Sequence, residues 1–193
     1  KDVILAAGFN ATSTGPATPV IARYTADGVL DATFGTAGKL IVSRLAGRFG
    51  SSLLPAADGG FYLGTYSGDV LKFKSDGTVD SNYGTNGLAS TNISSSTARG
   101  CLAPGPDNSL FVGGARYING DSRSVLAKLT PQGFLDSSFG TGGIVENNVS
   151  ADYYDSYDVI EYDPDSHTVL ALGGVNGGNV PTAYKVVLSR FKD

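Results

Sequence analysis

The chain has 193 residues, 41% of them hydrophobic, and a formal net charge of −4 at pH 7. Its Lys and Arg residues are scattered, which disfavours nucleic acid as a partner because phosphate binding needs clustered cations. Every apolar run is too short to span a bilayer, so we expect no membrane insertion. Glu, Gln and Met are nearly absent, whereas glycine occurs 27 times, which predicts a structure without long helices.

A nine-residue phrase recurs three times along the chain. It reads LDATFGTAG at residues 30–38, VDSNYGTNG at 79–87 and LDSSFGTGG at 135–143. The copies are 49 and 56 residues apart, and the intervals hold short apolar runs bounded by Gly and Asp turns. Such periods are typical of one four-stranded sheet per repeat, the blade of a β-propeller. The sequence therefore predicts an all-β propeller of four-stranded antiparallel blades, with about four blades present.

Each repeat is expected to hold four strands, a to d, ordered from the propeller axis outward. Strand a is predicted at 52–56, 101–104 and 159–162, and strand b at 3–7, 61–64, 110–113 and 169–172. Strand c and its closing turn are predicted at 20–28, 70–77 and 125–133, and strand d follows the phrase, as at 39–43. These elements predict a single repeat domain, 1–193, with approximate repeats 1–49, 50–99, 100–156 and 157–193.

The first and last repeats are each expected to be an incomplete blade. Residues 1–8 align with strand b just after a turn, and residues 188–193 align with strand c just before one. A strand b without its strand a would expose unpaired backbone groups along an edge. We therefore expect the rest of a longer chain, or a homo-oligomer, to complete the terminal blades.

The phrase resembles the consensus of the delta-60 repeat family, which runs close to LDxxFGxxG after an Asp-Gly turn. The resemblance covers the whole chain in register, although Tyr83 replaces Phe in the second copy and a fourth copy is missing. Members of that family are mostly large bacterial surface or secreted proteins with no common catalytic role. The resemblance thus implies a propeller. Together with the low Cys and Met content and the abundant Ser, Thr, Gly and Asn, it predicts an extracellular location.

No catalytic motif is recognisable in the sequence. The only histidine, His167, is expected in an exposed turn. The only cysteine, Cys101, is expected to be a small buried residue of strand a, with an intermolecular disulfide or a reactive thiol as alternatives. These two residues cannot supply the usual zinc ligands. We therefore expect no enzyme activity and no metal or cofactor; an enzyme using a cation in the propeller channel is an alternative.

Aspartates recur in the predicted turns, as the pairs Asp27/Asp31, Asp76/Asp80 and Asp163/Asp165. Carboxylates at this spacing can bind calcium, but Gln132 replaces the first Asp in the third copy. The favoured interpretation is an Asx turn, in which the carboxylate accepts backbone N–H groups. Sequons predict glycosylation at Asn10, Asn92 and Asn148 if the source is eukaryotic and secretory.

The two faces of a propeller differ in how well the repeats agree. The a-to-b and c-to-d turns form one face, here called the turn face, and they are nearly identical between repeats. The b-to-c and d-to-a connections form the other, the loop face, and they diverge. The divergent segments are 9–19, 65–68, 115–123 and 175–182 from b to c, and 45–50, 91–100 and 147–158 from d to a. Binding usually resides in loops that vary on a rigid scaffold.

The richest loop-face segments predict the ligand-binding residues. These are Tyr153, Tyr154, Tyr157, Arg116 and Tyr117. Tyrosine beside charged groups can stack on sugar rings and hydrogen-bond their hydroxyls; a solvated acidic loop with one or two Tyr packed on the next blade is the alternative. The predicted function is a non-catalytic extracellular binding or adhesion module for a carbohydrate or protein ligand. The alternative is a structural protein whose open blade edges are completed by neighbouring chains.

Overall fold

The computed structural model describes residues 2–10, 15–93, 100–118, 121–148, 153–177 and 184–192. Within these ranges the regular elements are strands and two short 3-10 helices, η1 (Ser43–Leu45) and η2 (Pro106–Asn108). The strands form antiparallel sheets of three to four strands that correspond to propeller blades. The predicted all-β fold class is therefore confirmed.

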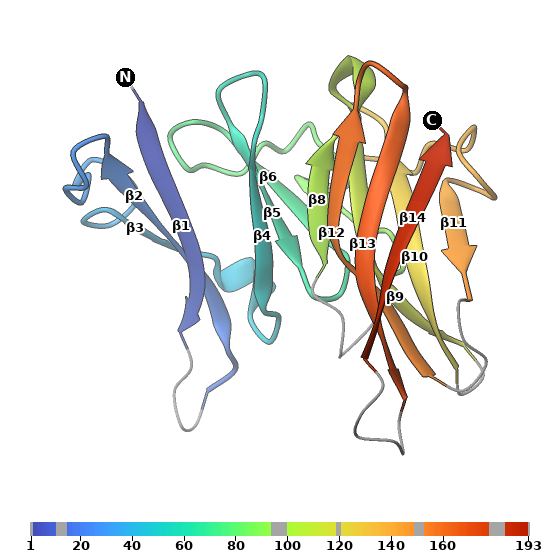
Figure 1. The fold of residues 1–193 in the computed structure, drawn as a ribbon. Coiled ribbons are helices and arrows are strands. Elements are labelled where there is room, and N and C mark those ends of the chain that lie inside the picture. The colour runs from blue at the N-terminus through green and yellow to red at the C-terminus, as the bar shows by residue number, and fades with distance from the viewer. Residues whose placement is uncertain are drawn as a thin grey trace.

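Four blades follow one another along the chain (Figure 1). Blade 1 contains β1 (Val3–Asn10), β2 (Thr18–Thr25) and β3 (Lys39–Ile41), and blade 2 contains β4 (Gly50–Pro55), β5 (Phe61–Thr65), β6 (Val70–Phe73) and β7 (Leu88–Ala89). Blade 3 contains β8 (Cys101–Pro104), β9 (Leu110–Ile118), β10 (Asp121–Leu129) and β11 (Ile144–Asn147), and blade 4 contains β12 (Tyr153–Asp163), β13 (Thr168–Gly177) and β14 (Tyr184–Lys192). One parallel pair, Ser122 with Tyr154, joins blades 3 and 4 into a single sheet.

The predicted b strands occupy equivalent places in the blades. They form β1, β5, β9 and β13, and each pairs antiparallel with the next strand of its blade. The turn face lies at the top of Figure 1 and the loop face at the bottom, and blades 1 and 4 lie at opposite sides of the view.

Two loop-face segments are more regular than predicted. Strand β12 begins at Tyr153, so the expected loop 147–158 is wrong from that residue onward, and the fourth blade starts before residue 157. The hairpin of β9 and β10 likewise absorbs most of the expected loop 115–123. A bulge between Tyr157 and Val159 shifts the register of β12. The bulge breaks the simple alternation of side chains that is typical of a half-buried strand.

The aromatic residue of the recurring phrase packs between neighbouring blades. The phrase aromatics Phe34, Tyr83 and Phe139 are 0%, 2% and 6% exposed. A Cβ atom added to Gly77 would lie 2.7 Å from the Phe34 ring, and one added to Gly133 would lie 2.8 Å from the Tyr83 ring. The Phe34 and Tyr83 rings thus pack on the turn glycine of the following blade, and only glycine leaves room for them.

Candidate functional site on the loop face

Part of the predicted site is assembled at the loop-face end of blade 3. Arg116 and Arg123 oppose each other across the β9–β10 pair. Both guanidinium groups donate to Glu146 of β11, with Arg116 Nη1 2.7 Å from Oε1 and Arg123 Nη1 3.4 Å from Oε2. Tyr117 follows Arg116 on β9 and is 57% exposed. The same carboxylate therefore orients both guanidinium groups.

A pocket of about 600 Å³ runs along β11 beside this cluster. Its lining residues are Arg116, Arg123, Gly140, Thr141, Ile144, Val145 and Glu146. The charged groups form its polar part, and their mutual ion pairs fix their positions. The pocket can therefore present oriented hydrogen-bond donors to a polar ligand.

The tyrosine-rich segment of β12 fulfils the prediction only in part. The backbone of Tyr154 pairs with Ser122, which in turn pairs with Tyr117, so these residues lie side by side on three strands. The side chains of Tyr153 and Tyr154 lie outside the described part of the structure.

Tyr157 is a correction to the predicted site. It is fully buried, and its hydroxyl donates to Ser189 Oγ at 2.9 Å and accepts from Asn147 Nδ2 at 3.2 Å. Its ring packs edge-on against Phe191 with centroids 5.9 Å apart. Tyr157 therefore holds β11, β12 and β14 together and is not available to a ligand.

A second cluster, which the sequence did not predict, lies on the loop face of blades 1 and 2. The rings of Phe9 and Phe49 meet at right angles with centroids 5.1 Å apart, and those of Phe49 and Tyr66 are 5.7 Å apart. We call Phe9, Phe49 and Tyr66 the aromatic row. Phe9 lies near the end of β1, Phe49 directly precedes β4, and Tyr66 lies in the β5–β6 turn. Phe9 is 56% exposed and Phe49 41%.

A polar network adjoins the aromatic row. Arg48 forms an ion pair with Asp69, whose side chain is only 9% exposed, while 42% of the Arg48 side chain remains exposed. Ser67 Oγ also donates to Asp69 Oδ2, at 2.9 Å. The backbone N–H of Tyr66 donates to the carbonyl of Phe49 at 3.1 Å, which ties the turn to the segment before β4. The segment before β4 and the β5–β6 turn thus carry both the rings of Phe49 and Tyr66 and the Arg48–Asp69 ion pair.

The turn-face aspartates have structural partners. Asp31 Oδ1 accepts the backbone N–H of Thr33 at 3.0 Å and its hydroxyl at 2.6 Å, and Asp136 Oδ1 is bound in the same way by Ser138. These hydrogen bonds, the side-chain bond first, hold the pKa of the Asp31 and Asp136 carboxyls below the usual value. The geometry is that of the Asx turn.

The other oxygen of each phrase aspartate faces a cation on strand c. Arg23 Nε lies 2.9 Å from Asp31 Oδ2, Lys72 Nζ lies 3.3 Å from Asp80 Oδ2, and Lys128 Nζ lies 3.7 Å from Asp136 Oδ2. The cation also covers an aromatic ring, as Arg23 does over Phe34 at 4.6 Å. The phrase aspartates therefore serve the packing of the blades.

The remaining chemical groups offer little to a reaction. Burial raises the pKa of the Cys101 thiol to about 12, which keeps it protonated, and its Sγ lies 3.6 Å from the carbonyl oxygen of Tyr157. His167 is exposed as predicted, with Nδ1 3.1 Å from the Tyr162 hydroxyl. Among the described residues, no His, Cys, Asp and Glu side chains gather in a group of three that could hold a metal ion.

Two further features concern the surface. The sequon residues Asn10, Asn92 and Asn148 are all exposed, whereas the Ser or Thr of each sequon lies outside the described residues. In the described part of the chain, no helix has the length and apolar character needed to cross a membrane.

Comparisons with known proteins agree with the fold. Residues 3–34 and 105–139 match the model of a family described as "Domain of unknown function (DUF5122) beta-propeller". Both segments include strands b and c and end at the phrase aromatic, Phe34 or Phe139. No curated protein sequence matches the chain.

One similar solved structure is that of a protein of unknown function from Bacteroides caccae. The two chains are 10% identical and superpose with a TM-score of 0.52, over 96% of this chain and 57% of that one. This chain therefore spans a little over half of the Bacteroides protein. At this identity the likeness concerns the fold alone.

Proposed function

We propose that the protein is a non-catalytic, extracellular binding module that recognises carbohydrate through its loop face. The observation that carries the proposal is the contrast between the faces. On the turn face, the phrase aromatics are buried and the phrase aspartates are paired with groups of their own blade. On the loop face, Tyr117 is 57% exposed on one side of blade 3, and the Arg116–Glu146 pair lines a pocket on the other side.

The chemistry of Tyr117 and of the two arginines, Arg116 and Arg123, suits a sugar. An exposed tyrosine offers a flat apolar ring and a hydroxyl, and the paired guanidinium groups offer oriented donors. Composition supports the extracellular location, since the chain has a single cysteine and no methionine to be oxidised.

A glycan array followed by titration tests the proposal. We expect the parent protein to retain at least one glycan, and Tyr117→Ala to weaken binding by about three- to tenfold, because one stacked ring contributes about 0.5–1.5 kcal/mol beyond its buried area. The matched control is Phe134→Ala, since Phe134 is 55% exposed but lies on the turn face. If Phe134→Ala abolishes binding and Tyr117→Ala leaves it unchanged, the site lies on the turn face and the proposal is wrong.

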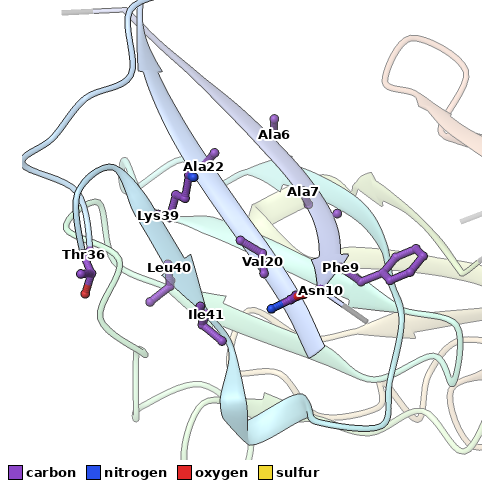
Figure 2. A pocket seen from close by; sticks show the side chains of 12 residues that line it. Ala6, Ala7, Phe9, Asn10, Val20, Ala22, Thr36, Lys39, Leu40 and Ile41 are labelled. Carbon is purple, nitrogen blue, oxygen red and sulfur yellow. The ribbon is translucent and has the colours of Figure 1, made fainter. Parts of the chain in front are cut away.

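Assembly is a second candidate function, favoured by the exposed apolar faces of the end blades. Ile4 pairs with Tyr24 in blade 1 as Phe61 pairs with Phe73 in blade 2, so Ile4 and Phe61 are equivalent. Ile4 is 50% exposed, whereas Phe61 is 2% exposed because blade 1 covers it. A pocket of about 780 Å³ lies on blade 1, and Figure 2 shows its lining residues along β1, β2 and β3.

Blade 4, at the opposite side of the molecule, also has an exposed apolar face. Leu188 pairs with Leu172 in blade 4 as Ile21 pairs with Ala7 in blade 1. Ile21 is fully buried against blade 2, whereas Leu188 is 70% exposed. In this second proposal, neighbouring chains cover both faces. Native mass measurement tests it: we expect an oligomer that Leu188→Asp dissociates, and a stable monomer would speak against assembly.

A further inference from the structure

The aromatic row has no evident role in folding. Elsewhere in blades 1 and 2 the aromatic rings that fill the interface are buried, as Phe61 and Phe73 are, with centroids 4.9 Å apart. Phe9 and Phe49, by contrast, are 56% and 41% exposed and contact other rings at the surface. The apolar surface that these rings leave in water adds nothing to core stability, so their convergence from separate segments needs another explanation.

The position of the row is specific to one blade boundary. Phe9 and Tyr66 are equivalent, because each lies two residues after the strand-b residue that pairs with Ile21 or Val70. The equivalent residue of blade 3 is Ala115, which is buried. The row is therefore a local feature and not part of the repeat. In Figure 2 the Phe9 side chain points away from β3, on the side of β1 where Phe49 lies.

The groups beside the row are polar but balanced in charge. Asp69 is nearly buried and neutralises Arg48, whose orientation is fixed by this ion pair. Because much of the Arg48 side chain is exposed, guanidinium N–H groups not directed at Asp69 can donate to an uncharged ligand.

We propose that the aromatic row is a stacking platform for a neutral oligosaccharide, with Arg48 as the hydrogen-bond donor to its hydroxyls. Three adjoining rings provide more apolar surface than one sugar unit covers, so an oligosaccharide fits better than a monosaccharide. The fixed guanidinium at the edge orients the chain, as polar groups do in mostly apolar ligand sites. This inference rests on the proposed function and adds to the Tyr117 region a second loop-face site, for which it names the ligand class.

Calorimetric titration with neutral hexasaccharides of glucose, mannose and galactose tests the inference, with sialyllactose as the acidic comparison. We expect one of the hexasaccharides to bind, and Phe49→Ala and Tyr66→Ala each to weaken binding about three- to tenfold. Phe134→Ala, on the turn face, is the matched control and leaves binding unchanged. Arg48→Lys retains a positive charge for Asp69 but loses the planar donor fork, so it weakens binding while the thermal midpoint stays the same.

The outcomes separate this inference from the proposed function. If a neutral hexasaccharide binds and only Tyr117→Ala or Arg116→Ala weakens it, the aromatic row is not the site, although the loop face still binds sugar. If only sialyllactose binds, the ligand class is wrong and the function stands. If no glycan binds at all, both the inference and the proposed function are overturned.

Discussion

The aromatic residues of the turn face and of the loop face are used in opposite ways. Phe34 and Tyr83 belong to the recurring phrase, are at most 2% exposed, and pack on a glycine of the next blade. Phe9 and Phe49 lie outside the phrase, are 56% and 41% exposed, and contact each other on the loop face. The recurrence of a residue in this chain therefore reports on blade packing. Phe9 and Phe49, in contrast, leave part of their aromatic surface exposed to solvent on the loop face.

The largest expected effect comes from truncating one ring on each face. Phe34→Ala is expected to lower the free energy of unfolding by about 3–5 kcal/mol, because it removes a fully buried ring between two blades. Phe49→Ala is expected to lower it by about 1 kcal/mol or less, because much of that ring is already in water. Urea unfolding of both variants measures the difference. If both variants lose a similar free energy of unfolding, the aromatic rings of the two faces do not differ in their contribution to stability.

A pair of glycine variants sharpens the same comparison within the turn face. Gly28 and Gly77 are equivalent and both have a positive φ, 78° and 89°, but only Gly77 faces a ring of the preceding blade. Gly28→Ala therefore introduces backbone strain alone, of about 1–2 kcal/mol. Gly77→Ala adds a Cβ 2.7 Å from the Phe34 ring, and overpacking is expected to cost a further 1–3 kcal/mol, roughly.

The control for this pair is a change of the ring itself. In a Phe34→Ala background the Cβ of Gly77→Ala no longer meets an obstacle, so the excess over Gly28→Ala is expected to disappear. Equal losses in the parent protein would mean that the phrase aromatic does not constrain the next blade.

The sequence predicts the blades better than it predicts the site. The phrase and the aligned turns indicate the period, and hence strands such as β5 and β9, because every repeat must solve the same packing problem. Packing of one or two tyrosines is the alternative predicted for this segment, but the sequence does not identify Tyr157 as one of them, since the bulge in β12 changes which residues face the core.

The aromatic row was missed for a different reason. Phe9, Phe49 and Tyr66 come from three separate connections, so no local pattern links them. The only sequence signal is that Phe9 and Tyr66 follow strand b at the same offset in consecutive repeats. Aligning the divergent connections by their flanking strands would have revealed this offset.

The smallest expected effect is the pH dependence of stability due to the phrase aspartates. Hydrogen bonds from Thr33 and Ser138, the hydroxyl bond first, hold the pKa of the Asp31 and Asp136 carboxyls below the usual value of 3.8. A carboxyl whose pKa is lower in the folded state stabilises the fold fully at pH values above its unfolded pKa. That contribution is lost as the pH falls through the folded pKa. The free energy of unfolding is therefore expected to decline below about pH 4.

Asparagine variants isolate this contribution. In Asp31→Asn/Asp136→Asn the amide oxygen can still accept the N–H and hydroxyl bonds, so the turns persist, but neither position can titrate. We expect the decline in acid to be shallower in this double variant, as measured by urea unfolding at a series of pH values from 7 to about 2.5. Asp27→Asn is the control, because it removes one negative charge from the same region of blade 1 and leaves the phrase intact. A double variant that loses stability in acid as steeply as the parent would show that other carboxyls carry the effect, and the Asx turns of the turn face would then matter for chain geometry alone.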